Sequence, residues 1–411
     1  MTAAQSRLLA LLRLPASDAA GNLPPADAAA WEDVLRLARR QFVAPLVWSR
    51  IRAARLEGGV PGPVRTALER ESRQNALRNL ALIDQLARLV RALEDRGIPV
   101  LLLKGLHVAQ ELYRGLDERV IRDIDFLVRA DRAADAANAL RALGYSAMSR
   151  ASVDERAILA VDMHLPPMVG PGVAPVEVHA SLGLLDRTPA EVMEEVWRRA
   201  VPVDLGPVAP LGLSREDLVL HLCVHASYQH LFAAGLRPCC DLAGAIDRWG
   251  TRLDWEAVCE RAVRWRWRRG VRLALDATRA LLGAAPPGGA VVALGDQADG
   301  PIPLQAAIGQ IFIEAGEAEG AKVHLARLVT EPSLGRKARW LAGRLFVSDR
   351  ELGSRYPVPA HPLGRWRVRG VRIAHLVARH AATVWKLARG DPRVRAAAAR
   401  AAALADWLAT G

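Results

Sequence analysis

The sequence predicts an α+β protein in which a small β-sheet core lies between two helical regions. Apolar residues recur at spacings of three and four over residues 1–97 and again over 210–411, which is the periodicity of helices that bury one face. Residues 98–209 add short apolar runs and runs of alternating polarity, which are typical of strands. With 411 residues the chain is long enough to bury one or two hydrophobic cores. We therefore expect three parts: an N-terminal helical segment packed on the core (1–97), the core itself (98–209) and a larger C-terminal helical domain (210–411).

The positive charge of the chain indicates an anionic partner. Hydrophobic residues make up 51% of the sequence and charged residues 24%, which excludes a disordered chain. The formal net charge of +12 and the pI near 10.4 come largely from arginine, whose planar guanidinium suits phosphate and carboxylate. Two interpretations of this charge remain open. It either forms a nucleic-acid surface or reflects a general arginine excess spread over helix faces, as in RWRWRRG (264–270).

Cysteine spacing and hydropathy predict a cytoplasmic protein without a membrane span. The chain has four cysteines, none in a CxxC spacing: Cys223, Cys239, Cys240 and Cys259. Such spacing does not suggest a disulfide framework, so a reducing compartment is expected. The N-terminal apolar run is interrupted by Arg7 and Arg13, and no later run reaches the ~20 apolar residues that a membrane span needs.

The first region should consist of helices broken at proline and glycine, at Pro15, at Pro24–Pro25 and around Gly58–Pro63. The longest predicted helix runs from about Pro63 to Arg96 and ends in a basic turn followed by glycine. It carries a leucine stripe typical of a helix that packs on another element. The stripe consists of Leu68, Leu77, Leu80, Leu82, Leu86, Leu89 and Leu93.

A lysine-glycine turn follows the first predicted strand. The strand, IPVLLL (98–103), is a continuous apolar run that suits burial on both faces. Lys104 and Gly105 end it, and HVAQELY (107–113) starts a helix at once. A helix that begins at glycine leaves its first amide groups free and its positive end outward, which favours phosphate. Lys104 adds a full positive charge beside that position.

Three carboxylates on two predicted strands suggest a metal site. In DIDFLV (123–128) the period of two puts Asp123 and Asp125 on one face, and such a close pair needs a cation to stay ionised. Hard oxygen ligands select magnesium, or manganese in its place, over zinc or copper. Glu177 and His179 share one face of a later strand, VEVHASL. Glu177 on a neighbouring strand would complete a two-metal set, with ions ~3.5 to 4 Å apart.

Several histidines and tryptophans allow more than one interpretation. His179 either orients a carboxylate or contacts the acceptor, or it forms a hydrogen bond within the sheet. His221 and His225 are i and i+4 and share a helix face. A zinc or phosphohydrolase-like site would use them with Asp241, whereas the favoured interpretation is packing of the helical domain on the sheet. The tryptophans in RWRWRRG, at spacing two, cannot share a helix face, which favours one surface and one core position over a base-stacking pair.

The joint pattern of these segments resembles a known family. LLLKGLHVAQELY, RVIRDIDFLV, a helix ending in LGY, VEVHASL and the later SREDLVLHLCVHASY together resemble the uncharacterised bacterial nucleotidyltransferases, relatives of the minimal and DNA-polymerase-β-like enzymes. The resemblance covers roughly Asn75 to Leu282. It implies a small mixed β-sheet nucleotidyltransferase core, flanked by the helical regions, with the acceptor bound by the C-terminal helical domain.

The resemblance also implies roles for particular residues. The metal carboxylates and catalytic residues fall on Asp123, Asp125 and Glu177, and the phosphate-binding turn falls on Lys104–Gly105. Arg119 and Arg122 are expected at the triphosphate because they are close to these residues in sequence. The wider superfamily has glycine followed by glycine or serine at the turn, and commonly aspartate as the third carboxylate. These departures affect the expected substrate more than the expected fold.

The activity that the resemblance implies is magnesium-dependent transfer of a nucleoside monophosphate from a nucleoside triphosphate, with ATP expected, and release of pyrophosphate. The acceptor would be a hydroxyl, amine or phosphate of a small molecule, peptide or protein. Two alternatives share the fold. One is modification of RNA, which the positive charge permits, and the other is a non-catalytic nucleotide-binding module, against which the three intact carboxylates argue.

Overall fold

The structure is a computed structural model that describes most of the chain. The described residues are 1–13, 27–148, 158–159, 162–182, 191–295, 302–313, 335, 352, 361, 363–374 and 391–409. The predicted breaks at Pro15 and Pro24–Pro25 lie outside them.

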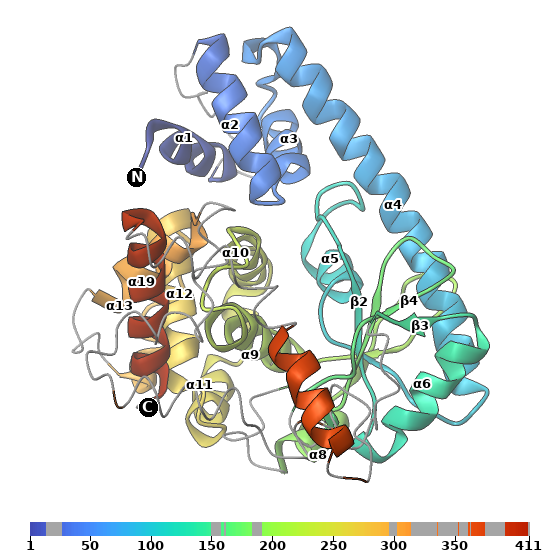
Figure 1. The fold of residues 1–411 in the computed structure, drawn as a ribbon. Helices are drawn as coiled ribbons and strands as arrows, with labels where there is room; N and C mark the ends of the chain where they lie inside the picture. Colours follow the sequence, from blue (N-terminus) through green and yellow to red (C-terminus); the bar gives the residue numbers. More distant parts are fainter. Residues whose placement is uncertain are drawn as a thin grey trace.

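The prediction of an α+β fold with a small mixed sheet flanked by helices is confirmed (Figure 1). Within the described residues the sheet has seven strands in the order β3-β4-β5-β2-β1-β7-β6. Two neighbouring pairs are parallel, β2 with β5 and β1 with β7, and the other pairs are antiparallel. The strands are β1 (Leu101–Leu102), β2 (Ile124–Leu127), β3 (Ser146–Ala147), β4 (Met168–Val169), β5 (Val176–His179), β6 (Val201–Pro202) and β7 (Leu211–Gly212).

The helices precede, interrupt and follow the sheet along the chain. Before it and within it are α1 (Ala3–Leu12), α2 (Ala28–Arg40), α3 (Ala44–Ala53), α4 (Gly62–Glu94), α5 (Leu106–Leu112), α6 (Ala133–Ala142) and α8 (Glu191–Arg198). After it come α9 (Arg215–Val224), a π-helical turn (His225–Gln229), α10 (Arg237–Trp249), α11 (Trp255–Arg264), α12 (Arg268–Leu282), α13 (Ile302–Ile311), a helix over 363–374 and α19 (Pro392–Ala409). Short 3₁₀ turns lie at Glu57–Gly59, Ala130–Arg132, Gly250–Arg252 and Val292–Leu294. Among the described helices, none is long and apolar enough to cross a membrane.

The two faces of the sheet belong to different hydrophobic clusters. Phe126 and Val178 pack in a cluster with the C-terminal half of α4 and with α6. Leu127, on the opposite face of β2, belongs to a second cluster that contains α1–α3 and α9–α12. Asp125 shares the face of Leu127, because side chains alternate along a strand. The carboxylates therefore face the helices after the sheet, and the α4 side is apolar.

Part of the predicted stripe on α4 is wrong. Leu77 and Leu80 are 63% and 53% exposed, whereas the other five leucines of the stripe are buried. In this stretch the inward face of α4 is polar instead. The side-chain amides of Asn75 and Asn79 both donate to backbone carbonyls of the loop before β2, at 3.0 and 2.9 Å from the Arg119 oxygen. The carbonyl groups of the loop need such donors. In this stretch the inward-facing residues of α4 are therefore asparagines, where leucines had been predicted.

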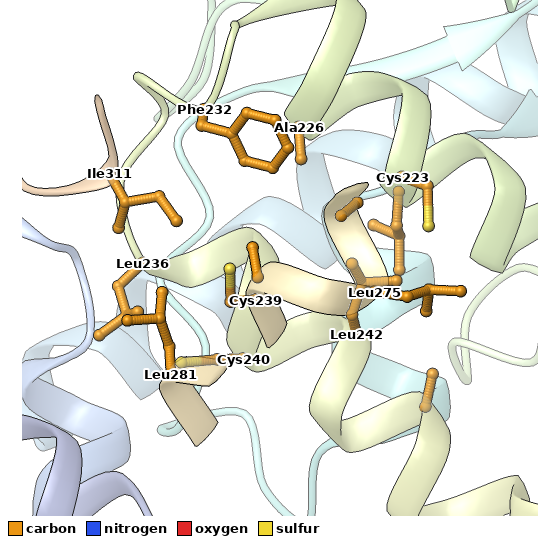
Figure 2. Packing of buried hydrophobic residues seen from close by; sticks show 14 of the residues in the cluster. Cys223, Ala226, Phe232, Leu236, Cys239, Cys240, Leu242, Leu275, Leu281 and Ile311 are labelled. Atoms are coloured by element: carbon orange, nitrogen blue, oxygen red, sulfur yellow. The ribbon is translucent and has the colours of Figure 1, made fainter. Parts of the chain in front are cut away.

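The four cysteines are free and buried. Cys239 and Cys240 lie among apolar side chains of α10 and α12, as Figure 2 shows. Burial raises the pKa of Cys239 to about 12 and that of Cys223 still further, so these thiols stay protonated at neutral pH. Their role is therefore packing.

The expectation that only one of Trp265 and Trp267 is buried is wrong. α11 ends at Arg264, Arg266 adopts a left-handed backbone (φ 61°), and α12 starts at Arg268. This turn, which helical periodicity does not describe, brings the two rings to 5.0 Å between centroids. Trp265 is 1% exposed and Trp267 0%, so neither can stack on a base.

We expect Trp267→Ala to lower the free energy of unfolding by about 3–5 kcal/mol, because it leaves a large cavity in a packed core. Denaturant unfolding measures this difference. Trp366, which is 59% exposed, provides the matched control, and Trp366→Ala should change stability by only about 0.5 kcal/mol. Equal losses in the two variants would contradict the core position of Trp267.

Candidate active site

Two neighbouring parallel strands bring carboxylates together. The register of β2 and β5 sets Asp125 opposite Glu177 and Leu127 opposite His179. Glu177 and His179 point to the same face as Asp125, because the strands are in register and side chains alternate. One potential ligand atom of Asp125, one of Glu177 and one of His179 lie within 4.8 Å of one another.

Lys104 forms an ion pair with the buried carboxylate of Asp125. Its Nζ lies 2.8 Å from Asp125 Oδ1, and the Asp125 side chain has no exposed area. Burial alone raises the pKa of Asp125, but the Lys104 ammonium and His179 hold that pKa well below its usual value. Burial lowers the pKa of Lys104, and the carboxylates of Asp125 and Asp123 raise it above its usual value. Both groups of the pair are therefore charged.

His179 lies between the two facing carboxylates. Its Nε2 is 3.3 Å from Asp125 Oδ1 and 3.5 Å from Glu177 Oε2. Burial lowers the pKa of His179, but its hydrogen bonds to Asp125 and Glu177 raise the pKa above the usual value. The ring also packs beside that of His164, 4.9 Å away between centroids. Of the interpretations open from the sequence, this geometry favours a histidine that orients carboxylates.

Asp123, the other predicted carboxylate, lies immediately before β2 at the edge of this cluster. It lines a pocket with Lys104 and Gly105. Burial and the neighbouring Asp125 carboxylate raise the pKa of Asp123. The structure thus brings Asp125, Glu177 and His179 together, whereas Asp123 lies outside that group and lines the pocket with Lys104.

This pocket lies between the lysine-glycine turn and the start of α10. It is lined by Lys104, Gly105, Arg119, Asp123, Leu222, His225, Arg237, Pro238 and Asp241. Its volume of about 10 Å³ has room for about one water molecule, so a larger molecule would have to lie at its mouth. Gly105 precedes α5 with a φ of 61°, a backbone that favours glycine, whereas an added Cβ would meet no atom closer than 3.5 Å.

Arg119 is a buried residue that lines the pocket. Its Nε and Nη2 donate to the two carboxylate oxygens of Asp241 at 2.9 and 2.8 Å, and its Nη1 donates to the Gly105 carbonyl at 3.3 Å. The Tyr113 hydroxyl donates to the same carboxylate at 2.7 Å. Asp241 is therefore engaged by Arg119 and Tyr113. Arg119 fixes the turn that carries Gly105.

Arg122 lies away from the pocket lining. Its side chain is exposed, and its guanidinium carbon lies 4.8 Å from the centroid of the Phe42 ring. Arg122 lies in the loop before β2 and is not part of the pocket lining.

Arg237 is a pocket cation that the sequence reasoning missed. It is the first residue of α10, and its Nη1 donates to the Val120 carbonyl at 2.9 Å. Burial, followed by the neighbouring Arg119, lowers its pKa from the usual arginine value. The only local signal is an arginine before the proline that starts a helix, which is common on surfaces. Its place in the site depends on how α10 packs against the loop before β2.

His221 belongs to α9, and His225, the first residue of the π-helical turn, lines the pocket. His221 is buried with neither ring nitrogen hydrogen-bonded, and burial together with Lys104 lowers its pKa to about 3. The His225 Nδ1 pairs with Gln229 at 2.9 Å. Within the described residues the only group that could hold a metal ion is Asp125, Glu177 and His179. This result favours the packing interpretation of His221 and His225 over a zinc site.

The site thus combines carboxylates on adjacent parallel strands of a mixed sheet with a lysine-glycine turn. The family described as uncharacterised nucleotidyltransferase matches residues 27–283, which is more than half of the chain, and the chain belongs to this family. The family name indicates nucleotidyl transfer in general. No curated protein matches the chain.

Proposed function

We propose that the protein transfers a nucleoside monophosphate from a nucleoside triphosphate, with ATP expected, to a hydroxyl, amine or phosphate of a small molecule, peptide or protein. The reaction would depend on magnesium and release pyrophosphate. One observation carries the proposal. The carboxylates of Asp125 and Glu177 lie opposite each other on adjacent parallel strands, and Lys104, which starts the lysine-glycine turn, contacts Asp125.

The residues of this cluster fit a divalent cation. Asp125 Oδ1 contacts Lys104 and His179, whereas Asp125 Oδ2 is buried without a hydrogen-bond partner. A buried carboxylate oxygen without a partner is costly, and a cation would satisfy it. Carboxylate oxygens select magnesium or manganese. We propose Asp125, Glu177 and Asp123 as the ligands, with His179 holding the first two in place.

Chain residues would bind and orient the triphosphate. Lys104 is a charged group next to the glycine of the turn, and Gly105 has no side chain to block an approaching phosphate. Arg119 and Arg237 add positive charge to the lining of the same pocket, although Arg119 already forms an ion pair with the Asp241 carboxylate. In this proposal Arg119 acts on phosphate mainly by holding the turn. Arg122, whose side chain is exposed, would contact the outer part of the nucleotide.

The transfer step needs alignment more than covalent chemistry by the protein. The acceptor oxygen or nitrogen would form a bond to the α-phosphorus as the bond to the bridging oxygen breaks, with pyrophosphate leaving. Bound magnesium would stabilise the charge on the α-phosphate and the leaving group. The helices after residue 210, which cover the carboxylate face of the sheet, are the proposed acceptor-binding region.

Burial of the tryptophan pair weakens the alternative of an RNA acceptor. Trp265 and Trp267, the aromatic residues between arginines that could have stacked on bases, are in the core. Transfer of label from α-labelled ATP to the small-molecule, peptide and RNA fractions of a cell extract would identify the acceptor. Label found only in RNA would replace the small-molecule proposal with the RNA alternative.

Calorimetry tests the metal dependence of nucleotide binding. We expect ATP to bind at least about tenfold more tightly with magnesium than with chelator, because the cation offsets repulsion between the carboxylates and the triphosphate. Glu177→Gln should lose most of this enhancement. Affinity that is the same with and without magnesium, and unchanged in Glu177→Gln, would count against a metal-dependent transferase.

A further inference from the structure

A second cavity lies apart from the active-site pocket. It has a volume of about 610 Å³, within the range of about 300–1,000 Å³ that is usual for small-molecule sites. It is enclosed by α1, α3, the end of α5, α10 and the end of α12, where the N-terminal helices approach the helical half (Figure 1). Its lining shares no residue with the pocket beside Lys104. Tyr113 lines it, and the Tyr113 hydroxyl bonds to Asp241 of the active-site pocket at 2.7 Å.

The charged residues of this cavity favour an anion. Four arginines and two acids line it: Arg13, Arg50, Arg114, Arg248, Glu118 and Asp247. Protein groups already engage the Glu118 carboxylate, because Ser49 Oγ donates to it at 2.6 Å and the Arg114 backbone N–H at 3.1 Å. Arg13 is also engaged, since it donates to the carbonyls of Leu281 and Ala280 at the end of α12.

Among the residues that line this cavity, Arg50 has a buried donor atom that lacks a hydrogen-bond acceptor. It projects from the last turn of α3 into the cavity lining, and its Nε is buried without a hydrogen-bond partner. A buried donor without an acceptor is costly, and a guanidinium is suited to bidentate binding of a carboxylate or phosphate. Apolar side chains of Leu46 and Leu112 line the same cavity, so a carbon skeleton can be buried beside the anion.

We propose that this cavity is a binding site for a small organic anion, a carboxylate or a phosphate ester, with Arg50 as its main contact. The site is distinct from the proposed nucleotide site, because the Tyr113–Asp241–Arg119 hydrogen bonds lie between the two. The inference does not depend on nucleotidyl transfer.

The test is saturable binding of two probes, inorganic phosphate and butyrate, by thermal shift and calorimetry. We expect at least one of the two probes to bind the full-length protein at a single site. Tighter binding of phosphate would indicate a phosphate ester as the ligand, and tighter binding of butyrate would indicate a carboxylate. Arg50→Gln should weaken that binding at least about tenfold, which is the loss of a charge-assisted hydrogen bond. Arg52→Gln removes the same charge from an exposed position of α3, and binding should persist.

Two further variants keep the result unambiguous. Ala243→Leu adds bulk to the cavity lining without changing charge, so it should also weaken binding if Arg50→Gln proves unfolded. Lys104→Ala changes the proposed phosphate turn and the ion pair with Asp125, both outside this cavity, so the folded variant should keep the probe affinity. The proposal fails if neither probe binds saturably. It fails also if Lys104→Ala removes the binding while Arg50→Gln and Ala243→Leu retain it, which would assign the anion to the active site.

Discussion

Replacing Asp125 with asparagine should reduce kcat/KM for nucleotidyl transfer by about a thousandfold, equivalent to about 4 kcal/mol of transition-state stabilisation. The change removes the negative charge that contacts Lys104 and leaves the buried Oδ2 position without a formal charge for a cation. Glu177→Gln should have an effect of similar size, since Glu177 faces Asp125 across the two strands. Transfer of label from α-labelled ATP, measured over a magnesium titration, gives both values.

The two variants should differ in stability, which separates catalysis from folding. Asp125→Asn leaves the buried Lys104 without its partner, whereas Glu177 is 21% exposed and contacts only His179 among the ion pairs of the described residues. Glu177→Gln should therefore lose activity at nearly unchanged free energy of unfolding. Glu194→Gln removes a carboxylate that is 62% exposed and paired with Arg129, and it should keep full activity. Retained activity in Glu177→Gln would rule out the proposed metal site.

Asp241→Leu should destabilise the protein by about 3–5 kcal/mol. Removal of this carboxylate leaves Arg119, which is 5% exposed, as an unpaired buried charge. It also removes the acceptor of the Tyr113 hydroxyl. The free energy of unfolding from denaturant titration measures the loss.

A double variant shows whether the pair serves stability or the site. Arg119→Met combined with Asp241→Leu removes both charges, so it should recover much of the stability that Asp241→Leu loses. The transfer activity of the double variant should be low, because the variant lacks the hydrogen bond from the Arg119 guanidinium to the Gly105 carbonyl. Full activity in the stable double variant would contradict the role of Arg119 in positioning the turn.

Much of the fold could be predicted because the signals are local. The period of two in DIDFLV and VEVHASL indicates strands and tells which side chains share a face, and each segment contains a four-residue strand in the structure. The glycine of the turn could be predicted for the same reason, because the positive φ that favours glycine is a property of this single residue. The division into 1–97, 98–209 and 210–411 stays a prediction. The two hydrophobic clusters do not follow it, because α1–α3 pack with α9–α12.

Long-range contacts account for what the sequence did not predict. Arg237 reaches the pocket through the packing of α10, and Asp241 binds Arg119 across more than a hundred residues of chain. The outward position of Leu77 results from a loop whose carbonyls require asparagine donors. The contact between Trp265 and Trp267 depends on a left-handed residue between two helices. None of these causes leaves a periodic pattern in the sequence.

The sequence by itself determined the α+β class, the lysine-glycine turn and the alternation that puts Glu177 and His179 on one face of a strand. Only the tertiary structure decided that β2 and β5 are adjacent, parallel and in register, so that Asp125 faces Glu177 and Lys104 contacts Asp125. Periodicity reports how one segment buries its own face. The meeting of distant side chains depends instead on which strands pair and which helices cover them, and that is settled by the packing of the whole chain.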